Sequence, residues 1–135
     1  MTVRLDVRHE SWPVAGAFTI SRGSKTSADV VIVEIVRGER SGRGECAPYA
    51  HYGETVDDVI EVVRSQEQQI EAGINRNELQ EALPAGAARN ALDCALWDLE
   101  AKETDTPVWQ RAGLPQPPSA LTTAFTLSLG TPEEM

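Results

Sequence analysis

The hydrophobic period of the chain changes near residues 49–53, and this change constrains the fold more than any other feature. Before that point, apolar and polar residues alternate over residues 3–10, and a β-branched run covers residues 30–36. Both patterns are typical of strands. After it, apolar residues recur every three to four positions over residues 56–70 and 87–102, which predicts helices. Strands followed by helices predict an α+β fold.

Breaker residues divide the first half of the chain. Pro13 and Gly16 are expected to end the first strand, and a short second strand is expected over residues 18–20. The polar stretch 21–27 predicts a surface loop. A hairpin turn is predicted over Gly38–Gly44, whose last glycines match a dinucleotide-binding fingerprint. Because no helix begins at those glycines, a nucleotide site is rejected.

Capping residues predict two further short helices. Asn75 followed by Glu78 has the spacing of a capping box, so a helix is expected from there to Leu83, where Pro84 stops it. Another short helix is expected over residues 108–112.

Cysteine and tryptophan give expectations about burial. Cys46 and Cys94 are too few for a disulfide framework and too far apart for a CxxC motif. Both are therefore expected to be buried small hydrophobes. Trp12 and Trp97 are expected to anchor the core.

The end of the chain predicts a second unit. A proline-rich linker, 115–119, precedes an expected strand over residues 121–129, and residues 131–134 combine the hydroxyl, proline and acidic groups that begin a helix. A lone strand leaves its backbone groups unpaired, so we expect the chain to be a fragment of a longer protein. The expected domains are residues 1–114, the linker, and residues 120–135.

Composition and charge exclude several classes of partner. The 135 residues carry a net charge of −9, which disfavours binding to nucleic acid. No apolar run approaches a membrane span and no secretory signal begins the chain, so no membrane and a cytoplasmic location are expected. Residues 1–52 sum to +1 and residues 53–135 to −10. A small anionic ligand would therefore prefer the first segment.

Four stretches of the chain carry a family pattern: FTISRGS at 18–24, GECAPY at 44–49, YGE at 52–54 and LPAGAARNALDCALWDL at 83–99. In these stretches the sequence resembles the enolase superfamily, and within it the L-Ala-D/L-Glu (dipeptide) epimerases. The resemblance implies an N-terminal capping domain, built from a three-stranded antiparallel sheet and helices, followed by a (β/α)7β barrel. Residues 121–129 would be the first strand of that barrel, and the rest of the barrel would be a partner of this chain.

The resemblance also implies a reaction in murein peptide metabolism. A Mg²⁺ ion and two lysines would remove and return the proton on the α-carbon of the second residue, through an enediolate. The metal is needed because a proton beside a carboxylate is very weakly acidic. These groups lie on later barrel strands in the family. The resemblance therefore places no catalytic residue and no metal ligand in this chain, and we expect the chain alone to be inactive.

What the resemblance does place here is substrate recognition. Arg22 matches the position from which dipeptide epimerases offer a guanidinium to the acidic side chain of the substrate. The alternative is a solvated loop arginine. Lys25 would supplement the positive field, and Thr126 matches a position whose hydroxyl contacts the bound dipeptide.

A second loop, residues 49–53, would close over the substrate. Tyr49, His51 and Tyr52 would line a lid that excludes water. The alternative is a rigid turn whose tyrosines pack on the first helix.

Two other functions remain open at this level. The parent could catalyse another enolase-superfamily reaction, of the muconate cycloisomerase or o-succinylbenzoate synthase type, because the cap fold is shared. The chain could also be a non-enzymatic α+β binding module. The substrate expected from the resemblance is a small acidic dipeptide. A homo-oligomer is compatible with the sequence.

Overall fold

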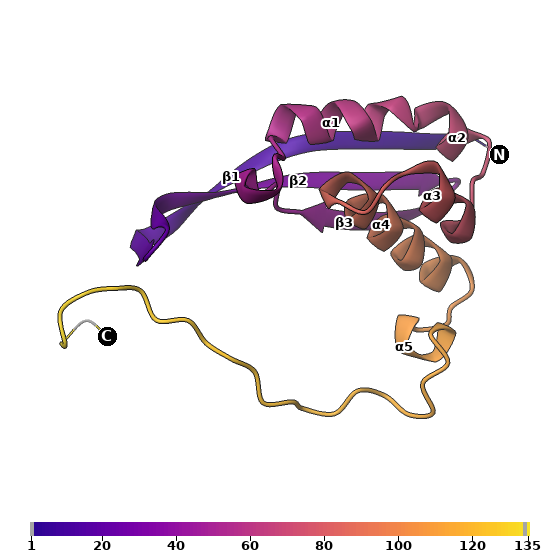
Figure 1. Ribbon diagram of the computed structural model, residues 1–135. Helices are drawn as coiled ribbons and strands as arrows, with labels where there is room; N and C mark the ends of the chain where they lie inside the picture. The colour runs from indigo at the N-terminus through magenta and orange to yellow at the C-terminus, as the bar shows by residue number, and fades with distance from the viewer. Residues whose placement is uncertain (1, 134) are drawn as a thin grey trace.

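A three-stranded antiparallel sheet with helices over one face forms the body of the molecule (Figure 1). The computed structural model describes residues 2–133 and 135. The strands follow the order β1-β2-β3 in space as in the sequence. Their bounds are β1 Val3–Ile20, β2 Gly23–Arg37 and β3 Arg40–Cys46. The helices are η1 Ala50–Tyr52, α1 Val56–Ser65, α2 Glu67–Glu71, α3 Arg76–Ala82, α4 Ala87–Glu103 and α5 Val108–Arg111. The α+β class and the three-stranded antiparallel sheet are thus confirmed.

The core lies between the sheet and helix α4. In the part of β2 that the helices cover, the alternate residues Val31, Val33 and Ile35 face the helices and are fully buried. From α4, the small residues Ala91 and Ala95 pack against them. The small side chains on α4 allow the helix and the sheet to approach closely.

The hairpin turn predicted over Gly38–Gly44 is formed, but it is shorter than predicted, because Gly42 and Gly44 lie within β3. The turn itself is two residues long, because Arg37 pairs with Arg40. A Cβ atom at Gly44 would overlap the carbonyl oxygen of Ala91 on α4. The glycines are therefore needed for contact with the helix and not for a change of chain direction.

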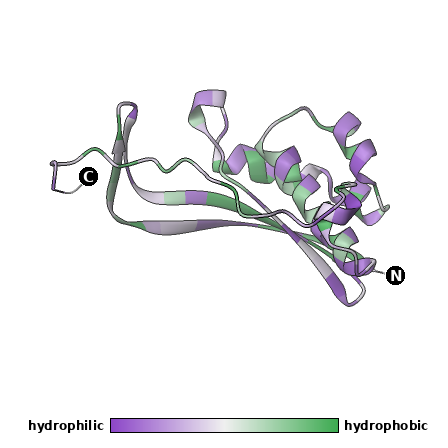
Figure 2. Ribbon diagram, turned by 90° about the horizontal axis from the view of Figure 1, so that it is seen from below, coloured by the Kyte–Doolittle hydropathy of each residue, from purple (hydrophilic) through white to green (hydrophobic). Residues whose placement is uncertain are grey.

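The strands β1 and β2 form one long hairpin, which also corrects the sequence prediction. Pro13 and Gly16 do not end β1; the pairing register shifts between Pro13 and Phe18, and Gly16 has a positive φ of 77°. This irregularity absorbs both breakers within the strand. The polar stretch 21–27 is mostly strand, since pairing resumes with Phe18 opposite Lys25. Polar side chains are compatible with a strand here because the hairpin extends beyond the helices (Figures 1 and 2).

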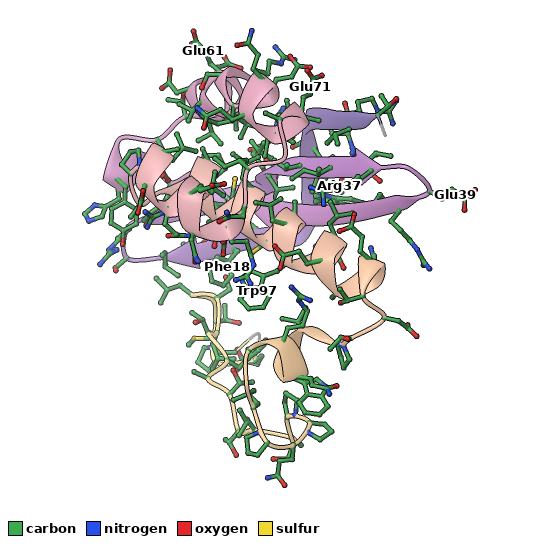
Figure 3. All side chains as sticks on the ribbon, turned by 90° about the vertical axis from the view of Figure 1, so that its right-hand side faces the viewer. Phe18, Arg37, Glu39, Glu61, Glu71 and Trp97 are labelled. Carbon is green, nitrogen blue, oxygen red and sulfur yellow. The ribbon has the colours of Figure 1, made fainter. Side chains whose placement is uncertain are left out.

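The helices agree with their predicted signals except at one point. The predicted helix over residues 56–70 is divided at Gln66, whose N–H donates to the carbonyl of Val63. The capping box at Asn75 is confirmed, because its side chain accepts from the N–H of Glu78 and the Glu78 carboxylate accepts from the N–H of Asn75. Glu61 and Glu71 project away from the sheet (Figure 3).

Two burial predictions are wrong. Trp12 is 57% exposed: Val3, Leu5 and Val7 of β1 pack against the core, so Trp12 points to the opposite face of the sheet. Cys94 is exposed, whereas Cys46 is buried as predicted. Trp97 is half-buried, with the guanidinium carbon of Arg76 3.4 Å from its ring centroid.

After α5, the described residues form neither helix nor strand. The strand predicted over residues 121–129 is not formed, because a strand requires a paired neighbour; Leu121 and Phe125 are each 85% exposed. At the predicted helix start, the N–H of Met135 donates to the carbonyl of Thr131, as in a first helical turn. Glu134, part of that prediction, lies outside the described residues. In the described part of the chain, no helix is long and apolar enough to cross a bilayer.

Candidate functional site

The two loops predicted to contact substrate border one cleft. This cleft has a volume of about 540 Å³ and lies between the outer part of the β1–β2 hairpin and the segment that follows β3. It is lined by residues 24–29 from β2 and residues 47–49 from the loop. The hairpin reaches this position because β1 and β2 continue past the helical layer (Figure 1).

A cation–π contact joins the two sides of the cleft. The Lys25 ammonium nitrogen lies 5.8 Å from the ring centroid of Tyr49. Such contacts contribute about 0.5–1 kcal/mol at exposed sites. The structure thus brings together Lys25 and Tyr49, which the sequence had placed on separate loops.

The aromatic residues of the second loop form a cluster. Tyr49, His51 and Tyr52 have ring centroids 5.3–5.9 Å apart. Tyr49 is half-buried, whereas His51 is exposed and Tyr52 is 76% exposed. Tyr52 therefore does not pack into the helical layer, and the cluster presents apolar ring surface to solvent beside the cleft.

Glu54 holds this loop in place, and sequence reasoning did not single it out as a site residue. One carboxylate oxygen accepts from the N–H of Tyr49 at 3.1 Å, and the other accepts from the N–H of Ala87 at 2.7 Å. Ala87 is the first residue of α4, so the carboxylate also lies at the positive end of that helix. Glu54 belongs to the family pattern at 52–54, but no local sequence pattern predicts that its carboxylate accepts a hydrogen bond from a residue 33 positions away.

Arg22 lies in the two-residue turn at the tip of the hairpin. Its side chain is exposed, and within the described residues its guanidinium has no ion pair or side-chain hydrogen bond. The pairing of Ile20 with Gly23 fixes the turn on both sides. The guanidinium is therefore available to an anion from solution, and all its donors remain open.

The cleft carries both signs of charge. Besides the positive charge of Lys25, the cleft contains the carboxylate of Asp29. The pKa of Asp29 is lowered by hydrogen bonds from the Ser11 hydroxyl and from His9. The Nε2 atom of His9 lies 2.9 Å from a carboxylate oxygen of Asp29. An anionic group would thus bind toward the Arg22 and Lys25 side of the cleft and away from Asp29.

The structure does not bring Thr126 into the cleft. Its side chain is exposed in the segment after α5. In the part of the chain that the structure describes, no group of three His, Cys, Asp or Glu side chains could hold a metal ion. These described residues therefore do not provide the donor set that Mg²⁺ requires.

Comparison with known proteins identifies the family. Residues 2–113 match the mandelate racemase/muconate lactonizing enzyme N-terminal domain. The L-Ala-D/L-Glu epimerase of Escherichia coli (strain K12) is 46% identical over 129 residues, which cover 96% of this chain and 40% of that protein.

Two solved structures are similar in fold. An enolase family member from Agrobacterium tumefaciens with homology to dipeptide epimerases, solved with bound sodium and L-Ala-L-Glu, has a TM-score of 0.93 and 45% identity. The match covers 98% of this chain and 40% of that one. The dipeptide epimerase from Enterococcus faecalis V583, complexed with Mg and L-Leu-L-Tyr, has a TM-score of 0.71 and 30% identity, over 82% of this chain and 34% of that one.

The chain spans less than half the length of each of these relatives. The match to the family model covers the whole sheet and all the helices described above. The chain therefore belongs to the mandelate racemase/muconate lactonizing enzyme family of the enolase superfamily, and it contains the N-terminal domain of that family.

Proposed function

We propose that the chain is the substrate-recognising part of a dipeptide epimerase of the L-Ala-D/L-Glu type. In this proposal, residues 1–114 are the capping domain, residues 115–119 are the linker, and residues 120–135 begin the barrel. The observation that carries the proposal is the exposed guanidinium of Arg22, which has no side-chain partner within the described residues and stands at the tip of the hairpin that borders the cleft.

The chemistry of Arg22 suits the acidic side chain of a glutamate-containing dipeptide. A guanidinium offers two parallel N–H donors to a carboxylate, which fixes the position of the carboxylate as well as neutralising its charge. Lys25 adds positive charge on the same side, and the rings of Tyr49, His51 and Tyr52 would exclude water around the bound substrate. Thr126 would contribute a hydroxyl from the neighbouring segment.

Proton transfer belongs to other residues. The reaction inverts the α-carbon of the second residue by removing and returning its proton, and in the family it requires Mg²⁺. Because the described residues lack a donor set for this ion, we assign the metal and the catalytic bases to the part of the relatives' length that this chain does not span. The full-length parent, with Mg²⁺, should introduce solvent deuterium at the α-carbon of the glutamate in L-Ala-D-Glu, whereas residues 1–135 alone should not.

Replacing Arg22 tests the proposed recognition. In the full-length parent, Arg22→Met should lower kcat/KM for L-Ala-D-Glu about 100-fold, because a charged hydrogen-bonded pair is lost. For a dipeptide with an apolar second residue, kcat/KM should fall by less than about threefold. Arg40→Met, an exposed arginine at the far end of the sheet, is the matched control. Equal losses for both dipeptides would show that Arg22 has a structural role only, and an inactive parent would refute the proposed function.

A further inference from the structure

The tip of the hairpin is tied to the segment that follows the linker by a small set of hydrogen bonds. The N–H of Thr19 donates to the hydroxyl oxygen of Ser128 at 2.9 Å, and the N–H of Leu129 donates to the carbonyl of Thr19 at 2.8 Å. The Ser128 hydroxyl in turn donates to the carbonyl of Ala17 at 3.2 Å. We call these three bonds the Ser128 clasp. The segment passes beside the tip of the hairpin at this point (Figures 1 and 2).

The position of the clasp follows from the sheet. β1 is an edge strand, so its outward N–H and C=O groups have no strand to pair with. At Thr19 the clasp provides a partner for both main-chain groups: the N–H donates to the Ser128 side chain, and the C=O accepts from the N–H of Leu129. Ser128 is half-buried at this contact, whereas the apolar residues around it are exposed. Hydrogen bonds rather than hydrophobic burial therefore fix the segment to the hairpin.

The clasp reaches both strands of the hairpin next to Arg22. The Thr19 hydroxyl lies 2.9 Å from the hydroxyl of Ser24, directly across the hairpin. Thr19 and Ser24 flank the turn that contains Arg22, and Ser24 also lines the cleft. On the other side, Ser128 follows Thr126 by two residues, a separation of about 7 Å along an extended chain.

We propose that Ser128 is a positioning residue, which holds the Arg22 turn at a fixed place relative to the segment that carries Thr126. This inference deepens the proposed function and, for its catalytic consequence, rests on it. Without the clasp, the two-stranded tip would keep its internal pairing but would move as a unit relative to that segment. Arg22 would then meet the substrate carboxylate with its donors less well oriented.

The structural part of the proposal can be tested without activity. In the 135-residue chain, Ser128→Ala should speed the amide hydrogen exchange of Thr19 about 10-fold, because its N–H loses its acceptor. The ¹⁵N order parameter at Arg22 should fall as well. Ser128→Thr keeps the hydroxyl, so the exchange rate of Thr19 and the order parameter of Arg22 should stay near their wild-type values. Ser119→Ala, in the same exposed stretch, should change neither. Unchanged exchange at Thr19, or an unchanged order parameter at Arg22, would overturn the proposal.

The catalytic part uses the full-length parent and a double-mutant cycle. Ser128→Ala should raise KM for L-Ala-D-Glu about 10-fold with little change in kcat, and it should cause no further loss when Arg22 is already Met. Losses that add independently in the double variant would refute positioning through Arg22. If the parent shows no epimerase activity, the proposed function fails, and the exchange and relaxation data alone then support or overturn the clasp.

Discussion

Gly42 and Gly44 determine how closely α4 can approach the sheet. A Cβ atom at Gly44 would overlap the Ala91 carbonyl, which is backbone and cannot rotate away. Gly44→Ala should therefore destabilise the chain by about 1–3 kcal/mol through overpacking. Glu45→Ala, the exposed neighbour in the same strand, should change the free energy of unfolding by less than about 0.5 kcal/mol. Urea denaturation followed by circular dichroism measures both, and equal effects would show that the helix moves freely to accommodate the methyl group.

The two cysteines should differ in reactivity. Burial raises the pKa of the Cys46 thiol to about 11, with the nearby Glu54 carboxylate adding to the effect. About one thiol in a thousand is then ionised near pH 8, and the side chain is also shielded from reagents. Cys94 is exposed, although its pKa is also raised, by desolvation first and by Asp93 second.

Iodoacetamide should therefore label the native chain once, at Cys94, and twice after unfolding in urea. Peptide mass spectrometry identifies the labelled position, and Cys94→Ser should leave no thiol that reacts rapidly in the native state. Rapid native labelling of Cys46 would contradict its burial.

Single residues were predicted from sequence only where their partners are near in the chain. The capping box at Asn75 is local, and it was found. Trp12 was predicted wrongly because a hydrophobic residue is buried only if an element covers it, and Trp12 lies on the face of β1 opposite to Leu5 and Val7, which pack against the core. Glu54 was missed as a site residue because its two bonds join backbone groups at Tyr49 and Ala87, which no local pattern relates.

At the scale of elements, Asp98 connects β3 to α4. Its carboxylate accepts from the N–H of Arg43 at 2.8 Å and from the Lys102 ammonium at 2.7 Å. Burial raises the pKa of Asp98, but these hydrogen bonds outweigh it, so the pKa lies below its ordinary value. The folded state therefore binds this proton less tightly than the unfolded state does. The stabilisation is complete above the unfolded pKa of about 3.9 and is lost as the pH falls through the lower, folded pKa.

Asp98→Asn should accordingly cost about 1 kcal/mol near pH 7, and the difference from wild type should shrink as the pH falls through the folded pKa of Asp98. Urea unfolding at a series of pH values measures this. Glu71→Gln removes an exposed carboxylate from α2 and serves as the control. A difference that stays constant down to the lowest pH would mean that the Asp98 charge does not stabilise the contact.

The elements themselves were largely predictable, whereas the limits of the hairpin were not. Period and capping predicted α3, α4 and α5 to within a few residues, but of β2 they predicted only residues 30–36. The prediction divided the outer hairpin into separate strands because Pro13 and Gly16 normally end a strand. The register shift that accommodates both residues depends on the partner strand. Residues 121–129 have the composition of a strand, but composition alone does not supply the neighbour that pairing needs.

At the scale of the molecule, the charge division predicted from sequence corresponds to a structural division. The near-neutral segment 1–52 forms the sheet and the hairpin with Arg22, and the acidic remainder forms the helical layer and the final segment. The cleft lies within the near-neutral segment, between residues 24–29 and residues 47–49. Its position on the long hairpin could not be predicted from sequence, because the cleft exists only where β2 and the segment after β3 are brought together by pairing.

The final segment should add little to the stability of the body. Leu121 and Phe125 are almost fully exposed, so they contribute little hydrophobic stabilisation, and the Ser128 clasp supplies only a few hydrogen bonds at an edge. Removing residues 120–135 should change the free energy of unfolding by less than about 1 kcal/mol, and the slope of that free energy against urea should stay the same. Urea denaturation of both chains tests this, with Gly44→Ala in each background as the reference for a core effect. A loss above about 2 kcal/mol would mean that the segment packs on the body in solution.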